Sequence, residues 1–470
     1  MKYFAPFLLL ISALSLLGQS GRTGAAGLSP TPTATPTVKQ MFEEANGYLK
    51  AKAAEFDAKK IAFSDSLFDR TKLEQRQLAA KYAAAAGARP GLTPEDHYYL
   101  GLLHWIAENL EGTAANLIQF VESENPAADH SQTARSLIAV IRAKQGKLED
   151  AEKLLAEYLA NDPKKLTERA RMEGEIAKAY QARKQFDKMA PHAEQDYAAA
   201  KAVVLEPGSM QRGLDEILDS GMLVFEAYRD LGDRTRAEAA LDDMRALAVR
   251  TQSSPFAYYA IDQKIKYLTE TGRKLDAQAL YKAALASATS DFTAKEVQED
   301  LTKRLKARDR QYEVLGQRAP EFLTKDQLWF PGKPQTLSEL RGKVVVLEFW
   351  ATWCAPCFDT FPDLIEWHEQ FKDQGLVILG VTRYYGQVNG LPADEGRETE
   401  ELKLFREKWR LPYDFVVGKD QSIQMLYGAM LLPTAAIIDR KGVVRYLETG
   451  TSTSRIEQMR DTIVRLLAEK

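Results

Sequence analysis

The sequence predicts a multidomain protein in which an all-α array of helices is followed by an α/β domain, with a mixed central sheet covered by helices on both faces. The chain has 470 residues, which is too long for a single core. From about 38 to 312, apolar residues recur at the three- and four-residue spacing of amphipathic helices. Beyond about 318, short β-branched runs alternate with amphipathic segments, which is typical of a sheet packed against helices.

The N-terminus has the pattern of a secretory signal. Lys2 precedes an apolar run from Tyr3 to Leu17, which is short for a membrane span. We predict a signal peptide over 1–26, with an uncleaved membrane anchor or a buried helix as alternatives. The Pro/Thr-rich segment 27–38 predicts an extended linker. The expected location is periplasmic or otherwise extracytoplasmic, with a membrane tether if the signal is not cleaved.

Charge and cysteine content exclude several classes of function. A formal net charge of −3 argues against a nucleic-acid partner. Cys354 and Cys357 are the only cysteines, and a bond across so short a loop restrains little chain entropy, which argues against a purely stabilising role. No further cysteine is available and His368 alone does not complete a zinc ligand set, so we expect no metal. We expect no cofactor other than a redox-active disulfide.

The segment 39–312 is predicted to be an array of helical repeats. The stretch "IAVIRAKQGKLEDAEKLLAEYLANDP" resembles a tetratricopeptide repeat, with Gly146 at the turn and the small Ala151 where two helices approach closely. Weaker matches elsewhere in the segment give repeats of about 38 to 48 residues, which is longer than the usual tetratricopeptide repeat. Such arrays often present a concave surface, so we expect a protein partner there, with a purely structural role as the alternative.

The segment 314–470 is predicted to form the α/β domain. The predicted strands lie at 343–350, 376–382 and 413–418, with a hairpin over 434–450. The predicted helices lie at 358–375, 398–411, 421–428 and 454–470.

Within this domain, "FWATWCAPC" at a strand-to-helix turn and "LLPT" further on resemble the thioredoxin fold. The stretches "RAPEF", "TLSELRGKVVVLEFWATWC" and "PTAAIIDRKGVV" are similar to its TlpA/ResA-type branch, the exported thiol–disulfide oxidoreductases. The resemblance implies an enzyme that acts on protein disulfides, with exported disulfide-containing proteins such as apocytochrome c as partners, and an upstream membrane thiol donor. The alternative is a helical-repeat binding or scaffold protein whose thioredoxin-like domain is a redox-regulated docking module.

The dithiol chemistry predicts a role for each cysteine. Cys354 is expected at a helix N-terminus, where the helix dipole lowers the pKa of its thiol and makes it the nucleophile. Cys357, one turn later, would attack Cys354 and release the substrate. Ala355 and Pro356 complete the active-site motif, since proline is tolerated in the first helical turn.

Glu348 is an ionisable residue on an otherwise apolar strand, six residues before Cys354. Burial should raise the pKa of its carboxyl toward neutrality. The resemblance implies that it accepts the proton of Cys357, and a simple ion pair with a lysine is the alternative.

The resemblance also implies that Trp353, Leu432 and Pro433 bind substrate, with a cis peptide bond before Pro433. One position departs from the family. Several members carry a glutamate three residues after the second cysteine, where this chain has Thr360. If that glutamate tunes proton transfer in the family, Glu348 must act alone here.

Other cysteine chemistries fit the motif poorly. Phe358 follows Cys357, which excludes covalent haem attachment through Cys-x-x-Cys-His. Thr352 is two residues before Cys354, not three as in the peroxiredoxin pattern. The Ala-Pro pair lacks the histidine of strongly oxidising motifs, and the resemblance favours a reductase.

Overall fold

The structure is a computed structural model that describes residues 35–469 apart from 63, 207–213 and 323–326. The predicted signal peptide, 1–26, and most of the predicted linker, 27–38, lie outside the described residues. The first described helix, α1 (Val38–Ala58), begins after Thr37, whose hydroxyl oxygen accepts a hydrogen bond from the Gln40 amide at 3.2 Å. Among the described residues, no helix is both long and apolar enough to cross a membrane.

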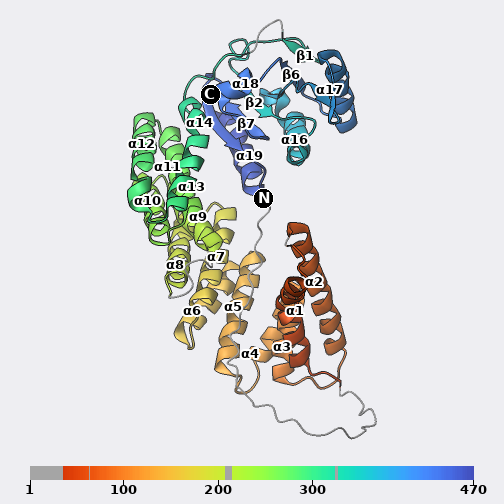
Figure 1. The fold of residues 1–470 in the computed structure, drawn as a ribbon. Coiled ribbons are helices and arrows are strands. Elements are labelled where there is room, and N and C mark those ends of the chain that lie inside the picture. The colour runs from red at the N-terminus through yellow and green to blue at the C-terminus, as the bar shows by residue number, and fades with distance from the viewer. Residues whose placement is uncertain (1–34, 63, 207–213, 323–326, 470) are drawn as a thin grey trace. The chain divides into compact units, whose positions relative to one another are not determined.

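The described part of the chain forms two compact units, which divide between Ala240 and Leu241. The described part of the first unit is all-helical, which confirms the predicted class of this region (Figure 1). Its helices are α1, α2 (Asp65–Gly87), α3 (Pro94–Ile106), α4 (Leu110–Val121), α5 (Ala128–Lys144), α6 (Leu148–Ala160), α7 (Leu166–Ala182), α8 (Phe186–Val204) and α9 (Leu214–Leu231). The division between the units falls within α10 (Arg234–Arg250). The second unit continues with α11 (Ser254–Glu270), α12 (Lys274–Asp291), α13 (Lys295–Ala307) and α14 (Asp309–Val314).

The turns between successive helices repeat one backbone motif. A residue with positive φ follows α3, α5, α7, α9 and α11, at Glu108, Gly146, Lys184, Gly232 and Gly272 respectively. In each turn the next amide donates to the carbonyl five residues back, as Lys147 does to Arg142 at 2.8 Å. The same helical hairpin therefore recurs along the chain, whereas its membership of the tetratricopeptide family stays a prediction.

The second unit ends in an α/β domain built on a six-stranded mixed sheet, with strand order β1-β6-β3-β2-β7-β8. β2, β3 and β6 are parallel, and β1, β7 and β8 are antiparallel to their neighbours. The strands are β1 (Leu328–Phe330), β2 (Val344–Phe349), β3 (Leu376–Arg383), β6 (Asp414–Gly418), β7 (Thr434–Ile438) and β8 (Val444–Thr449). Sequence analysis missed the short edge strand β1 and a separate hairpin of β4 (Gln387–Val388) and β5 (Leu391–Pro392).

Helices cover both faces of this sheet, as predicted. They are α15 (Ala355–Phe358), α16 (Phe361–Phe371), α17 (Glu395–Trp409), α18 (Ser422–Tyr427) and α19 (Thr453–Ala468), with a short 3-10 turn (Lys372–Gln374) after α16. Val344 and Val346 of β2 pack in one apolar core with α16, α17 and α19. Val345 and Leu347 pack in a second core with α14 and α18. Because strand side chains alternate, Glu348 faces the side of α16 and α19.

The predicted helix over 358–375 is divided. α15 ends at Phe358 and α16 begins at Phe361. Pro362 has no amide hydrogen to donate to the Phe358 carbonyl, so the regular helix is interrupted at Asp359 and Thr360. This break places Thr360 between the two helices, where its side chain is fully buried.

The end of α14 shares a core with the sheet. Val314 and Leu315 are buried in the same apolar cluster as Ala429 and Val444, and the Gly316 amide donates to the Val444 carbonyl at 2.8 Å. Sequence analysis placed the domain limits at 39–312 and 314–470, and these limits stay a prediction. The compact unit that contains the sheet begins further upstream, at Leu241.

Candidate active site

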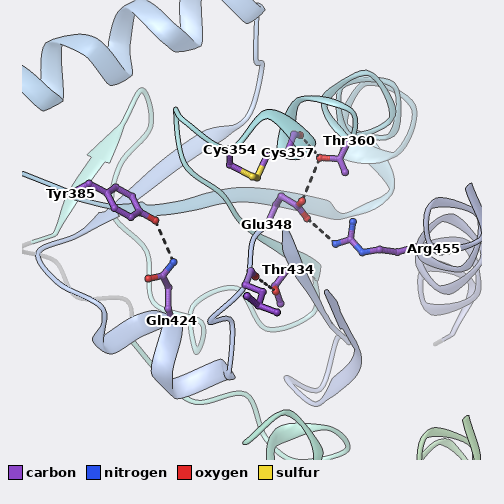
Figure 2. The surroundings of a disulfide bond; sticks show 9 residues. Glu348, Cys354, Cys357, Thr360, Tyr385, Gln424, Thr434 and Arg455 are labelled. Carbon is purple, nitrogen blue, oxygen red and sulfur yellow. Dashed lines mark hydrogen bonds and ion pairs between the residues drawn. A yellow bond between two sulfur atoms is a disulfide. The ribbon is translucent and has the colours of Figure 1, made fainter. Parts of the chain in front are cut away.

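The two cysteines lie just beyond the carboxyl end of β2 and form a disulfide (Figure 2). Cys354 is the N-cap residue of α15, and Cys357 lies within that helix. The Cys357 amide donates to the Cys354 carbonyl at 3.0 Å, which closes the turn between them. Cys354 is 3% exposed and Cys357 is fully buried, so of the two sulfur-bearing residues only Cys354 has any contact with solvent. The start of a helix also directs positive partial charge toward the Cys354 sulfur.

Glu348 lies beneath this disulfide with almost no exposure to solvent. The Thr360 hydroxyl donates to the Cys357 carbonyl at 2.8 Å, and the same oxygen is 3.4 Å from Glu348 Oε1. The single proton of the Thr360 hydroxyl can thus be donated to the Cys357 carbonyl or to the Glu348 carboxylate. Thr360 therefore links the carboxyl group to the backbone of the second cysteine.

Arg455 of α19 provides the charge opposite Glu348. Its Nη2 is 3.6 Å from Glu348 Oε2, and both side chains are buried. Burial raises the pKa of Glu348 to about 7, and the Arg455 charge and the Thr360 hydrogen bond oppose that rise. The partner is thus an arginine, whereas sequence analysis considered only a lysine. No sequence signal marked Arg455, because it lies on the last helix, far from Glu348 in the chain.

The predicted cis peptide bond is present between Leu432 and Pro433. The register that pairs Thr434 of β7 with Phe349 of β2 brings this bond beside the segment that leads from β2 to Cys354. Pro433 is buried and Leu432 is half-buried. Met430 and Leu431, just before them, are 51% and 67% exposed. The structure therefore presents an apolar loop next to the dithiol, and a role in substrate binding stays a prediction.

Trp353 is an exposed residue of the motif, at 57%. Its ring contacts Tyr385 edge-on, with 5.3 Å between the ring centroids. The Arg383 guanidinium lies 4.0 Å from the centre of the Tyr385 ring, and Gln424 Nε2 donates to the Tyr385 hydroxyl at 3.5 Å. Sequence analysis missed Tyr385 and Arg383. The signal available was topological, since parallel β2 and β3 bring their carboxyl ends to the same edge of the sheet.

The remaining motif residues, Ala355 and Pro356, form the first turn of α15 as expected. The described residues contain no group of histidine, cysteine, aspartate and glutamate side chains arranged to hold a metal ion. A Cys-x-x-Cys pair after a buried strand, a helix that begins at the first cysteine and a cis-proline just before the neighbouring strand together define a thioredoxin-like domain of the thiol–disulfide oxidoreductase class.

Comparisons with known proteins agree with this class. Residues 315–447 match the AhpC/TSA family. The thiol-disulfide oxidoreductase ResA of Geobacillus thermodenitrificans is 31% identical over 140 residues, which are 30% of this chain and 72% of the relative. The thioredoxin-like protein YneN of Bacillus subtilis is 31% identical over 147 residues, 31% of this chain and 78% of the relative. The chain therefore belongs to the ResA-type family of thioredoxin-like thiol–disulfide oxidoreductases.

Among solved structures, a thioredoxin-family thiol:disulfide interchange protein from Chlorobium tepidum is 21% identical. The match covers 32% of this chain and 96% of that protein, with a TM-score of 0.26. The curated relatives match about a third of the chain, and the family model lies entirely downstream of α14.

Proposed function

We propose that this protein is an exported thiol–disulfide oxidoreductase that reduces protein disulfides through Cys354 and Cys357. The observation that carries the proposal is the site geometry. The Cys354–Cys357 disulfide lies at the start of a helix, directly above a buried carboxyl group on the preceding strand. Cys354, Cys357 and Glu348 act on the substrate disulfide and its protons, and Trp353, Leu432 and Pro433 form the surface that binds the substrate.

In the reduced protein, the Cys354 thiolate attacks one sulfur of the substrate disulfide. The substrate S–S bond breaks, a mixed disulfide forms and the leaving substrate thiolate takes a proton from water. Cys357 then loses its thiol proton and attacks Cys354. The mixed disulfide breaks, the Cys354–Cys357 disulfide forms, and the second substrate thiolate leaves. Two electrons pass from the dithiol to the substrate, and an upstream thiol donor returns them.

Glu348 is suited to accept the proton of Cys357. A general base is most effective when its pKa lies near the operating pH, and burial raises the pKa of Glu348 to about 7. Arg455 favours the ionised carboxylate that must be present before the transfer. Thr360 stands between the carboxyl group and the backbone of Cys357, and its hydroxyl is within hydrogen-bond distance of both.

In this proposal, the segments outside the thioredoxin-like domain determine where the protein is located and which proteins it binds. The predicted signal over 1–26 directs the chain out of the cytoplasm, to the periplasm or an equivalent compartment. The helical hairpins over 39–312 recruit a protein partner and bring its disulfide to the site. Exported proteins such as apocytochrome c are the substrate class, and a membrane protein is the thiol donor. The competing function is a scaffold with a redox-regulated docking module.

Turnover separates these functions. The full chain is added at catalytic concentration to a disulfide-bonded peptide, with dithiothreitol as the electron source. We expect many peptide molecules reduced per molecule of protein. Cys354→Ser should abolish this acceleration, and Lys372→Ala, in the exposed 3-10 turn after α16, should retain it. Reduction that stops after one equivalent would favour the docking module, and no reduction by the dithiol form would contradict the proposal.

A further inference from the structure

Helix α14 lies outside the segment that matches the family model, yet one of its side chains reaches into the thioredoxin-like domain. Gln311 is 3% exposed. Its side-chain nitrogen Nε2 donates to the Gly428 carbonyl at 2.8 Å and to the Thr449 hydroxyl at 3.1 Å. The Gly428 carbonyl can only accept, so it fixes the orientation of the amide with the nitrogen toward β8.

From Gln311 a chain of hydrogen bonds continues to the loop before the cis-proline. The hydroxyl oxygens of Thr449 and Thr434 are 2.8 Å apart, and the Thr434 hydroxyl lies 2.6 Å from the Leu431 carbonyl. Both ends of the chain fix its direction, because an amide nitrogen donates and a carbonyl accepts. Gln311 therefore donates to Thr449, Thr449 to Thr434, and Thr434 to Leu431, so each hydroxyl both accepts and donates.

The loop that receives this chain carries the exposed apolar side chains beside the dithiol. The Leu431 carbonyl is the last acceptor in the chain, one residue before the cis peptide bond. A second hydrogen bond holds the other end of the loop, where the Gly450 amide donates to the Pro433 carbonyl at 2.8 Å. The chain through Thr449 and the bond from Gly450 therefore both originate at the end of β8. Gln311 packs against this same end of the strand.

Buried ionic contacts hold α14 in this position. Arg308, at the start of α14, donates to both carboxylate oxygens of Glu448 at 3.1 and 3.2 Å and to the Leu447 carbonyl at 3.2 Å. Arg308 Nε also lies 3.4 Å from Asp262 of α11. Gly428, whose carbonyl accepts from Gln311, has a φ of +64°, and a Cβ at this position would lie 2.9 Å from Gln311 Cγ. The absence of a side chain at Gly428 thus permits the close approach of Gln311.

We propose that Gln311 is a positioning residue that fixes the loop formed by residues 430–433 for binding a disulfide-bonded polypeptide. The inference rests on the proposed function and extends it to a helix beyond the family segment. A polypeptide substrate must find the loop backbone already in place, because ordering it on binding reduces affinity. A small disulfide reacts at Cys354 without using the loop. Gln311 should therefore affect the KM for polypeptides and leave the chemical step unchanged.

The test compares the full-length protein with Gln311→Leu, Thr449→Val and the double variant. The Gln317→Leu variant serves as the control, since Gln317 is exposed on the same segment. Substrates are a short disulfide-bonded peptide and bis(2-hydroxyethyl) disulfide. Loss of a neutral hydrogen bond predicts that the KM for the peptide rises about fivefold in either single variant. We expect kcat, and the rate with the small disulfide, within twofold of the unsubstituted protein. The double variant should be no worse than a single one, because both interrupt the same chain.

Several results would overturn the proposal. The first is an unchanged KM for the peptide. The second is an equal loss of reduction rate with the peptide and with the small disulfide. The third is a rise in KM in the double variant that equals the sum of the two single effects in free energy. If Gln311→Leu does not fold, Thr449→Val tests the same chain from within the sheet. If the unsubstituted protein reduces neither disulfide, the proposed function fails. Hydrogen exchange then tests independently whether Gln311 positions the loop formed by residues 430–433. The amides of Ala429 and Gly450 should exchange faster in both single variants, and unchanged exchange would refute the positioning role.

Discussion

Replacing Glu348 with glutamine removes the buried carboxyl group beneath the disulfide and preserves the size of the side chain. In the folded protein, burial raises the pKa of Glu348 from its ordinary value of 4.5 to about 7. The folded state therefore binds one more proton than the unfolded state between these two pH values. The stability associated with the neutral carboxyl is fully present below pH 4.5 and is lost as the pH rises through about 7.

The size of this effect follows from proton linkage. Each pH unit between the two pKa values lowers the free energy of unfolding by about 1.4 kcal/mol, which amounts to about 3 kcal/mol in all. Glutamine does not titrate, so the Glu348→Gln variant should lack this dependence. The variant leaves the buried Arg455 charge without its counter-ion at every pH, which changes the stability by a constant. The slope with pH, rather than the stability at any one pH, therefore carries the prediction.

The assay is urea unfolding of the oxidised proteins between pH 4.5 and 8.5, followed by tryptophan fluorescence. Five of the six tryptophans lie at position 329 or beyond, so the signal reports mainly on the thioredoxin-like domain. The oxidised form is used because its cysteines do not titrate. Relative to the variant, the midpoint of the unsubstituted protein should fall by about 1 to 2 M urea across this range. Parallel pH dependences in the two proteins would refute the assignment of a raised pKa to Glu348.

Three further predictions concern the surroundings of the site. Arg455→Met removes the charge that opposes the rise in the pKa of Glu348. The pH midpoint for resolution of the mixed disulfide should therefore move above 7, and an unchanged pH–rate profile would contradict this. Burial opposes ionisation of Asp262, but Arg308 and a neighbouring lysine outweigh it and lower the pKa of Asp262. The resulting stability is present at neutral pH and lost in acid, so Asp262→Asn should reduce the difference in urea midpoint between pH 7 and pH 3. A fragment over 316–470 lacks the buried Leu315 and should unfold at a urea midpoint lower by about 1 M or more than the full chain, which equal midpoints would disprove.

The elements that sequence analysis predicted well are those with strong local patterns. β2 is an uninterrupted apolar run apart from Glu348, and its burial on both faces follows directly from that pattern. The cysteine pair and Pro433 were identified from the short motifs in which they occur, "FWATWCAPC" and "LLPT". The break between α15 and α16 was also encoded locally, by Pro362, but an amphipathic pattern that continues across it concealed the interruption.

The contacts that complete the site join residues far apart in the chain, and no local pattern reports them. Arg455 meets Glu348 because α19 returns to the face of the sheet toward which alternate β2 side chains point. Gln311 meets Thr449 because α14 packs at the end of β8. β1 has only three residues, too few for a periodicity, and its pairing with β6 defines it as a strand.

The order of the two thiols is the central claim, and trapping of a mixed disulfide tests it most directly. The Cys357→Ser and Cys354→Ser variants are each mixed in reduced form with a disulfide-bonded peptide, quenched in acid and analysed by intact mass. Because Cys354 lies at the helix start and Cys357 is fully buried, the Cys357→Ser variant should retain the peptide on Cys354. The Cys354→Ser variant should retain little or none. Equal retention by both variants, or retention on Cys357 alone, would contradict the assignment of nucleophile and resolving thiol.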